Sequence, residues 1–262
     1  MASIITLLTD FGTRDAYVAA MKGVILGLNP QAVLVDLTHE VPPQDILAGA
    51  FILAEAAPYF PEGTIHLAVV DPGVGTERRG LAARARGQFW VGPDNGLFSL
   101  AFGGAPEAII VSLIEPAFFR PEVSATFHGR DIFAPVAAHL SLGVDPARLG
   151  PTIRDPVALA MAEPVFTPAE ARGEIIYVDR FGNLVSNLPG ERLAAWLAGR
   201  DFRLQVGSLD ISQLSHTYGE VPAGHCLALI GSHGFLEIAG NRESAARKLG
   251  AGKGLSLKIN KI

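Results

Sequence analysis

The first 70 residues of this chain alternate between short apolar runs and segments with helical periodicity, and this alternation restricts the possible folds more than any other feature. Residues 4–9, 33–37 and 65–70 are short and apolar, which is typical of buried strands. Between them, residues 15–28 and 46–57 place apolar side chains at helical spacing and end close to prolines. This order predicts right-handed crossovers and a mostly parallel sheet with flanking helices, as in an α/β domain. Further along, the pattern predicts a hairpin at residues 81–91, a strand at 108–113 and a helix at 132–142.

The last third of the chain has a different pattern. Three prolines without clear periodicity lie between residues 154 and 168 and mark a domain boundary. We therefore expect an α/β domain at residues 1–160 and a smaller domain at residues 170–262. In the smaller domain, short apolar runs separated by glycine-rich turns predict a β-barrel or sandwich. Its expected strands are residues 174–178, 202–206, 226–230, 235–238 and 255–259, and its expected helices are residues 192–197 and 244–249.

Composition excludes several kinds of partner. The formal net charge is −5 and no basic patch is visible, which argues against nucleic acid as a partner. No apolar run approaches the roughly 18 residues that a membrane helix needs, so no membrane partner is expected. The N-terminus lacks the features of a signal peptide, and the single cysteine, Cys226, excludes an intrachain disulfide. These observations predict a cytoplasmic protein.

The strongest candidate for a functional site is the stretch LAVVDPGVGTERRG at residues 67–80. Its apolar start is the end of an expected strand, which delivers Asp71 into a loop of proline and glycine. Arg78 follows seven residues later and Arg79 comes next. Ligands of parallel α/β sheets bind beyond the carboxyl ends of the strands, so a carboxylate and a guanidinium here are candidates for a site. The alternative is a surface turn whose aspartate caps loop amides and whose arginines are solvated.

There are two more polar clusters. One follows the first expected strand, and the other comes just before the helix expected at residues 132–142. Asp10 and Asp15 are five residues apart, and their carboxylates can hold a ribose diol and an amine. The alternative is that they cap the next helix, and we expect Asp15 to do so in either case. His128 stands close to Arg130 and Asp131. A lone histidine is more often structural than catalytic, but the start of a helix favours a role in a site.

A fourth cluster lies in the smaller domain. Residues 179–183 read DRFGN, for which a hairpin turn is the simplest interpretation, and residues 231–241 add serine, histidine, glutamate and asparagine. The chain has no phosphate loop, no dinucleotide glycine fingerprint, no nucleophile elbow and no zinc-ligand spacing. Four residues of metal-binding type have spacings that are not diagnostic of a metal: Asp10, His39, Asp71 and His128.

Six motifs taken together resemble one family. TDFGTRDAYV, VVDPGVGTERRG, GPDNGLFS, TFHGRDIFAP, VDRFGNLVSN and SHGFLEIAGN follow one another in this order over essentially the whole chain. The chain thereby resembles the S-adenosylmethionine (SAM) hydrolases, also called SAM hydroxide adenosyltransferases, which are relatives of fluorinase and chlorinase. The resemblance implies an N-terminal α/β domain, a C-terminal β-barrel and a homotrimer with the ligand between neighbouring subunits. It implies SAM as the substrate and neither a metal nor another cofactor.

The resemblance also assigns roles to residues of this chain. It implies Asp71, Arg78 and His128 as the catalytic trio, whereas the halogenating relatives carry tyrosines in place of Asp71 and His128. One position departs from those relatives, which have arginine where His233 stands. The resemblance also implies that Asp71 contacts the substrate. The other implied contacts are Asp10 for the ribose hydroxyls, Asp15 and Asp179 for the amine, Asn183 for adenine or nearby ligand atoms, the Gly240 backbone for adenine, and Ser232 and Glu237 for the methionine portion.

The expected reaction is attack of water or hydroxide on the ribose C5′ of SAM, which releases adenosine and L-methionine. The R-sulfonium epimer is a candidate substrate. The alternatives are a halogenase that forms 5′-halo-5′-deoxyadenosine, or a non-catalytic protein that binds adenosine or SAM. The sequence leaves open which of Asp71 and His128 accepts the proton of water. It also leaves open how the methionine carboxylate is held, given His233.

Overall fold

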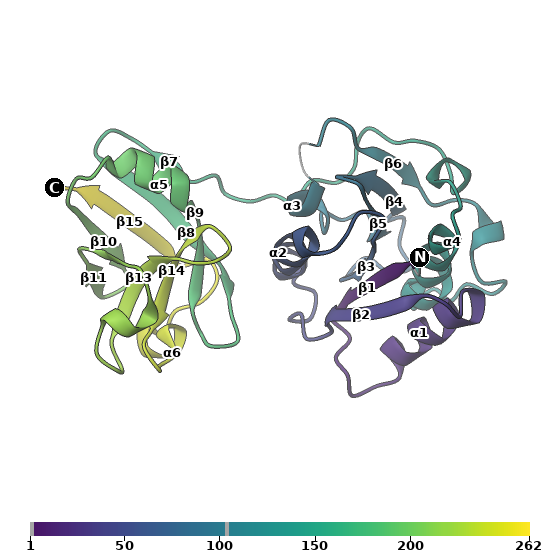
Figure 1. Ribbon diagram of the computed structural model, residues 1–262, viewed down its shortest axis with the longest axis horizontal. Coiled ribbons are helices and arrows are strands. Elements are labelled where there is room, and N and C mark those ends of the chain that lie inside the picture. Colours follow the sequence, from purple (N-terminus) through teal and green to yellow (C-terminus); the bar gives the residue numbers. More distant parts are fainter. Residues whose placement is uncertain (1–2, 103–104) are drawn as a thin grey trace. The chain divides into compact units, whose positions relative to one another are not determined.

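A sheet of six strands forms the centre of the N-terminal part of the chain (Figure 1). The structure is a computed structural model that describes residues 3–102 and 105–262. It divides into two compact units, Met1–Ala160 and Met161–Ile262, and each is described by itself. The strands of the first unit are β1 (Ile4–Thr9), β2 (Val33–Thr38), β3 (Ile65–Val69), β4 (Gly80–Ala85), β5 (Gln88–Pro93) and β6 (Ile109–Ser112).

The order of strands in this sheet is β2-β1-β3-β5-β4-β6. Strand β1 pairs in parallel with β2 and β3, and β3 pairs in parallel with β5. Strand β4 runs antiparallel to both of its neighbours, β5 and β6, and is therefore reversed relative to the others. The prediction of a mostly parallel sheet is confirmed.

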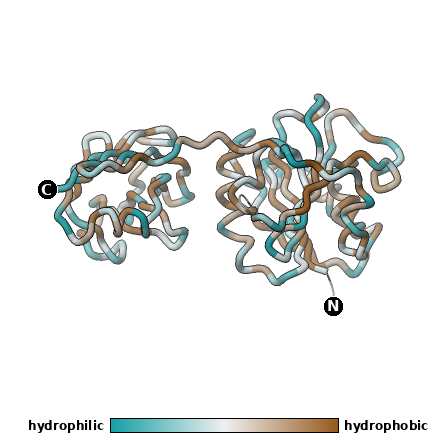
Figure 2. The backbone as a smooth tube through the Cα atoms, turned by 90° about the horizontal axis from the view of Figure 1, so that it is seen from above, coloured by the Kyte–Doolittle hydropathy of each residue, from teal (hydrophilic) through white to brown (hydrophobic). Residues whose placement is uncertain are grey.

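Helices cover the two faces of the sheet (Figure 1). Helix α1 (Tyr17–Leu28) packs against α4 (Ala134–Ser141) on one face, and α2 (Ile46–Ala56) packs against the short α3 (Ser99–Phe102) on the other. Side chains of α1, α4 and the strands share one core. Figure 2 shows hydrophobic and hydrophilic stretches alternating along the backbone of this unit.

Two predictions about the helices of this unit are wrong in detail. Helix α1 begins after Ala16 and has no side-chain cap, so Asp15, which is exposed, does not cap it. The helix expected at residues 132–142 begins earlier, as a π-helical turn at Gly129–Phe133 that leads into α4. Pro135, in the first turn of α4, lacks a backbone N–H, so it fits the start of that helix. π-Helical turns are frequent at functional sites.

The second unit consists of one sheet of nine strands that is nearly closed into a barrel. Its order is β11-β10-β15-β8-β9-β14-β13-β12, and β7 pairs with β8. The strands are β7 (Val165–Phe166), β8 (Glu170–Val178), β9 (Leu184–Pro189), β10 (Phe202–Val206), β11 (Leu209–Ile211), β12 (Leu214–Ser215), β13 (Cys226–Ile230), β14 (Phe235–Gly240) and β15 (Ser256–Lys261), and the helices are α5 (Gly190–Leu197) and α6 (Ala245–Leu249).

The barrel prediction is confirmed, but the sequence did not reveal β9. This strand pairs with β8 and β14 although it carries the polar residues Ser186 and Asn187, which are buried. The Ser186 hydroxyl donates to the Leu236 carbonyl at 2.8 Å, and the Asn187 side-chain oxygen accepts from the Glu174 backbone N–H at 2.9 Å. Partners distant in the sequence thus satisfy these polar groups. Within the part of the chain that the structure describes, no helix has both the length and the apolar character to cross a membrane.

Candidate active site

Two of the predicted aspartates lie at the same edge of the N-terminal sheet. Asp10 directly follows β1, and Asp71 lies two residues beyond the end of β3. These strands are parallel neighbours, and Thr9 pairs with Val69 at their carboxyl ends. Both carboxylates therefore leave the sheet at the edge where ligands of parallel α/β proteins bind.

Asp71, Arg78 and His128 meet in one hydrogen-bonded group. The Arg78 guanidinium donates from Nε to Asp71 Oδ1 at 3.1 Å and from Nη2 to Asp71 Oδ2 at 2.5 Å. The same Nη2 lies 3.0 Å from His128 Nδ1. The side chains of Asp71 and Arg78 are only 4% and 9% exposed, so water screens their attraction weakly. The guanidinium therefore bridges the carboxylate and the imidazole.

This geometry determines the protonation state of His128. A guanidinium has only donors, so Nδ1 of His128 must accept the hydrogen bond from Arg78. The ring is then neutral and carries its proton on Nε2. Burial and the positive charge of Arg78 lower the pKa of His128 below its usual value, against the opposing effect of Asp71 and Asp131. At neutral pH, Nε2 of His128 is thus a hydrogen-bond donor.

Close packing holds the loop that carries Arg78. Gly75 has a φ of +77°, and a Cβ built on it would lie 2.3 Å from the carbonyl oxygen of Ala125. Only glycine fits there, because any side chain would collide with the backbone. The loop after β3 therefore packs against the segment that leads into His128, which accounts for the meeting of Arg78 and His128.

The neighbouring Arg79 has a different role. Its Nε donates to Asp94 Oδ2 at 2.9 Å and its Nη1 to Asp155 Oδ1 at 3.0 Å. Asp94 is buried, with a side chain that is 1% exposed. These ion pairs fasten the end of the first unit to its sheet. Of the two adjacent arginines, Arg78 belongs to the candidate site and Arg79 to the scaffold.

Asp10 is held by the loop after β2. Its Oδ2 accepts from the backbone N–H of Gln44 at 2.8 Å. Gln44 has a φ of +66°, a left-handed conformation that a residue other than glycine adopts only at a cost in free energy. The backbone N–H of Gly12 donates to the His39 carbonyl at 2.7 Å. The turn that contains Asp10 is therefore tied to residues 39–44.

Contacts of the buried His39 continue from this turn. His39 Nδ1 lies 2.9 Å from the Thr9 hydroxyl, and His39 Nε2 lies 3.0 Å from Asp36 Oδ1. The Thr9 hydroxyl also accepts from the backbone N–H of Phe11 at 3.2 Å. His39 therefore helps to hold the turn that contains Asp10, through the Thr9 hydroxyl. No sequence pattern indicated this role.

All five residues predicted for substrate contact in the second unit line one cavity. Its volume is about 690 Å³. The DRFGN segment is the hairpin turn between β8 and β9, where Asp179 Oδ1 accepts from the backbone N–H groups of Phe181 and Asn183 at 2.8 Å. The residues that the structure brings together here are Asp179, Asn183, Ser232, Glu237 and Gly240.

The cavity of the second unit also contains Tyr218 and Phe181, for which no role was predicted from the sequence, and His233, which the sequence marked as a departure from the halogenating relatives. The Tyr218 hydroxyl lies 3.1 Å from Glu237 Oε1, and His233 Nε2 lies 3.0 Å from Glu237 Oε2. Burial and the Glu237 carboxylate raise the pKa of Tyr218 to about 12, so it stays a donor. Phe181 exposes 78% of its surface at the cavity and offers a flat ring. An exposed aromatic residue in a tight turn is the signal that would have identified it.

Asp15, like Asp10, is a predicted site residue that lies outside the hydrogen-bonded trio. It is exposed, two residues before Tyr17. Within residues 3–102 and 105–262, no group of three or more histidine, cysteine, aspartate or glutamate side chains is arranged to hold a metal ion. Asp10, His39, Asp71 and His128 therefore do not form a metal-binding group in this structure.

Comparison with known proteins identifies the family. Residues 5–150 match the family model of the SAM hydroxide adenosyltransferase N-terminal domain, and residues 173–258 match that of the C-terminal domain. The chain belongs to the SAM hydroxide adenosyltransferase family. The resemblance inferred from the six motifs is thereby confirmed.

Relatives in this family cover nearly the whole chain. A (R)-S-adenosyl-L-methionine hydrolase of Thermus thermophilus is 44% identical over 260 residues, which are 96% of this chain and 97% of that protein. A protein of the same name from Salinispora tropica is 41% identical and covers 97% of each chain. A fluorinase of Actinopolyspora mzabensis is 27% identical over 98% of this chain and 97% of its own.

Solved structures show the same fold. A crystal structure of a Thermotoga maritima protein superposes with a TM-score of 0.89 at 35% identity, covering 98% of this chain and 99% of the other. A crystal structure of a Thermus thermophilus protein superposes with a TM-score of 0.79 at 41% identity, covering 100% of both chains.

Proposed function

We propose that this protein hydrolyses SAM to adenosine and L-methionine, with the R-sulfonium epimer as substrate. The observation that carries the proposal is the bridge from Asp71 through Arg78 to His128 at the carboxyl edge of a parallel sheet. The names of the relatives at 34–44% identity support both the reaction and the epimer. The complete trio argues against a protein that only binds adenosine or SAM.

The chemistry requires a nucleophile and no acid. The sulfonium of SAM is already an activated leaving group, so the bond from C5′ to sulfur breaks without protonation. Water attacks C5′ in line with that bond, and its oxygen gains positive charge as the new bond forms. The trio then has to orient one water molecule and accept one proton. General-base assistance of this kind typically contributes about 10²- to 10⁴-fold in rate.

The geometry of the trio favours Asp71 as the proton acceptor. Nδ1 of His128 is occupied by Arg78, and Nε2–H of the same ring can only donate to the water oxygen. Asp71 keeps lone pairs beyond those that accept from Arg78. A carboxylate is a weak base, but the attacking water becomes strongly acidic once its oxygen bonds to carbon. Asp71 therefore takes the proton, His128 orients the water, and Arg78 keeps both in place.

The remaining predicted residues are assigned to substrate binding. We assign the ribose hydroxyls to Asp10, which lies at the same sheet edge as Asp71, and the amine to Asp15. In the second unit, the exposed ring of Phe181 offers a surface on which adenine can stack. The other binding assignments rest on the shared cavity: Asp179 for the amine, Asn183 and the Gly240 backbone for adenine, and Ser232 and Glu237 for the methionine portion.

The assembly proposed with this function is a homotrimer with the ligand site at the subunit interface, working in the cytoplasm without a metal. Sedimentation of the purified protein tests the trimer: a species of three times the chain mass supports it, and a monomer contradicts it. Turnover that persists in EDTA supports the metal-free reaction. Loss of turnover with the chelator would replace it with a metal mechanism.

A halogenase is the alternative enzyme. The fluorinases among the relatives are 27–29% identical to this chain, below the hydrolases. The Asp71 carboxylate is almost completely buried, and a negative charge there opposes binding of a halide ion. Hydrolysis therefore fits the site better than halogenation.

Incubation with SAM, in buffers with and without chloride or fluoride, tests the proposal directly. We expect adenosine and methionine in equal amounts by chromatography, at a rate independent of halide. A 5′-halo-5′-deoxyadenosine product would support the halogenase instead. Binding of SAM without any product would reduce the protein to a binding module.

A further inference from the structure

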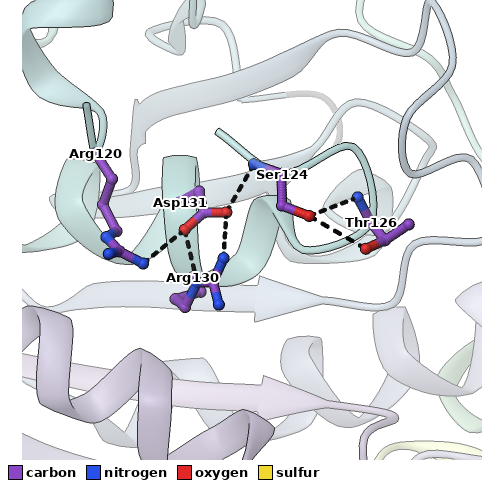
Figure 3. A network of polar contacts seen from close by, with 5 residues as sticks. All are labelled: Arg120, Ser124, Thr126, Arg130 and Asp131. Atoms are coloured by element: carbon purple, nitrogen blue, oxygen red, sulfur yellow. Dashed lines mark hydrogen bonds and ion pairs between the residues drawn. The ribbon is translucent and has the colours of Figure 1, made fainter. Parts of the chain in front are cut away.

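Asp131 is a fully buried carboxylate close to the trio, and the function proposed above does not use it. Its Oδ1 accepts from Arg130 Nε at 2.7 Å and from Arg120 Nη1 at 3.1 Å. Its Oδ2 accepts from Arg130 Nη2 at 2.8 Å and from the backbone N–H of Ser124 at 2.9 Å (Figure 3). Two carboxylate oxygens offer about four lone pairs, so the hydrogen bonds saturate this side chain.

Asp131 stays ionised in this cluster. Burial would raise the pKa of its carboxyl group, but the hydrogen bonds from Arg130 and Ser124 and the charges of the two arginines hold that pKa below its usual value. Arg120 and Arg130 also line a surface hollow together with the exposed Glu122. Two carboxylates thus balance two guanidinium groups, and among these four side chains no positive charge is in excess to bind an anion. The saturated carboxylate therefore points to a task within the chain.

The Asp131 carboxylate joins the two ends of one segment, residues 120–131. The backbone N–H of Arg120 donates to the Asp131 carbonyl at 2.9 Å, in addition to the contact from the Arg120 side chain. Ser124 is held through its own backbone N–H, and its hydroxyl accepts from the backbone N–H of Thr126 at 3.2 Å. Asp131 thus closes this segment into a loop whose ends are fixed.

This loop carries His128 of the trio. His128 directly precedes the π-helical turn Gly129–Phe133, and Asp131 is the third residue of that turn. The backbone N–H of Asp131 donates to the Phe127 carbonyl at 3.1 Å, so the turn is bonded to both neighbours of its first residues. The carboxylate therefore fixes the turn from which His128 Nδ1 lies 3.0 Å from Arg78 Nη2.

Ala125 is a second link between the loop and the trio. Its carbonyl packs so closely against Gly75 that a Cβ built there would lie 2.3 Å from the carbonyl oxygen. Ala125 follows Ser124, whose backbone N–H is bonded to Asp131. A shift of Ser124 would move Ala125 with it and disturb the loop that carries Arg78.

We propose that Asp131 is a positioning residue for the hydrolysis, whose carboxylate holds His128 where Nδ1 accepts from Arg78. The proposal rests on the hydrolase function and adds to the trio a residue that acts through His128 and not on the substrate. Without the carboxylate, residues 120–131 lose three anchors at once. The imidazole then moves away from the guanidinium, and the trio loses its hold on the orientation of water.

Asp131→Asn tests the proposal, because an amide has nearly the same shape but only one oxygen that accepts. Asp94→Asn is the matched control. Asp94 is a buried aspartate of the same unit that accepts from Arg79 Nε at 2.9 Å and from the backbone N–H of Val157 at 2.8 Å, outside the trio. Both variants should lower Tm, because each leaves donors without their carboxylate. Kinetics are measured below the Tm of either variant.

We expect kcat to fall about tenfold or more in Asp131→Asn, since a displacement of about 1 Å in a catalytic group can cost about 10²-fold in rate. The affinity for adenosine should change less than about twofold, because the residues assigned to ribose and adenine lie outside this loop. In Asp94→Asn, kcat should stay within about twofold of the wild type. Equal losses of kcat in the two variants, or a higher KM with constant kcat in Asp131→Asn, would overturn the proposal.

The ring nitrogens of His128 give a readout that lost stability alone would not move. In the wild type Nδ1 accepts and Nε2 carries the proton, so their ¹⁵N resonances should be widely separated. In Asp131→Asn the ring should exchange between its two neutral tautomers, and the separation should shrink. In Asp94→Asn it should remain as in the wild type. Comparison with His128→Gln assigns the resonances, and an unchanged separation in Asp131→Asn would refute the proposal.

Arg120→Gln keeps the proposal testable if Asp131→Asn does not fold. It removes one anchor of the carboxylate, from a side chain that is 41% exposed, so the fold should persist. Both kcat and the separation of the ring resonances should fall, by less than in Asp131→Asn. If both stay at their wild-type values, Asp131 does not position His128 through this anchor and the proposal fails.

Failure of the hydrolase function would be distinguishable from failure of this positioning role. If the wild type forms no adenosine from SAM, the proposed function fails. The ring resonances of His128 do not depend on turnover, so they still test whether Asp131 holds the imidazole. A smaller separation in Asp131→Asn would then support the positioning role, and an unchanged separation would refute it.

Discussion

The two units each present a carboxylate beside a histidine, but the order of the groups differs. In the first unit the Arg78 guanidinium stands between Asp71 and His128, so a cation is at the centre. In the second unit Glu237 stands between Tyr218 and His233, so an anion is at the centre. A cation that orders a base and a donor suits attack by water on carbon. An anion surrounded by donors in a cavity of about 690 Å³ suits binding.

Similar residue types therefore have different roles in the two units, and the charge at the centre of each hydrogen-bonded group decides which role. The first group should therefore control kcat, and the second should control KM.

Asp71→Asn should lower kcat by about 10²- to 10⁴-fold, because the amide cannot accept the proton of water. Adenosine affinity should change less than about threefold, since the ribose and adenine contacts remain. Steady-state kinetics and adenosine titration measure the two effects. If kcat were unchanged, Asp71 would lose its role as the base and the division between the units would fail.

Arg78→Lys should lower kcat by about 10²-fold, since an ammonium cannot keep both the paired contact to Asp71 and the bond to His128. Arg79→Lys is the matched control, because Arg79 pairs with Asp94 and Asp155 outside the trio. In the control, kcat should stay within about twofold and Tm should fall. Equal losses of kcat in the two variants would contradict the separation of site and scaffold.

Glu237→Gln should raise the KM for SAM about tenfold and change kcat little, because it removes the negative centre of the second network. Tyr218→Phe removes one hydrogen bond to the same carboxylate and should raise KM by about threefold to tenfold. A fall in kcat with constant KM would place the second network in the chemical step.

The effect of pH should be the smallest of these effects near neutrality, and kcat should fall only at lower pH. His128 must be neutral to accept from Arg78, and its pKa lies below the usual value of about 6.5. The rate should therefore stay constant down to about pH 6.5 and decline only below it. The unfolded chain takes up this proton first as pH falls, so the contribution of His128 to stability is present above pH 6.5 and declines below it. A decline of kcat that begins above pH 7 would contradict a neutral His128.

Much of the fold was predictable because the strands are apolar runs with clear ends. Strands β1, β10 and β13 begin and end at the predicted residues. Strand β9 was not predictable, because buried Ser186 and Asn187 interrupt its apolar pattern and are satisfied by partners distant in the sequence. Asp15 is a good helix cap by type, yet α1 begins one residue further on.

The candidate site shows the same limit. Asp71 and Arg78 are seven residues apart in one loop, and the sequence placed them together. The contact between Tyr218 and Glu237, and the hydrogen bond from Arg120 to Asp131, depend on how separate segments pack. The geometry, and not the sequence, also shows that Nδ1 of His128 accepts from Arg78. Propensity and motif define candidates, whereas tertiary contacts define which atom donates and which accepts.

Reaction of SAM in ¹⁸O-labelled water is the most direct test of the central claim, that the trio directs water onto C5′. We expect one ¹⁸O atom at the 5′ oxygen of adenosine by mass spectrometry, in EDTA as in its absence, and at least a hundredfold slower labelling with Asp71→Asn. Adenosine without the label, or equal labelling rates for the wild type and Asp71→Asn, would contradict the account.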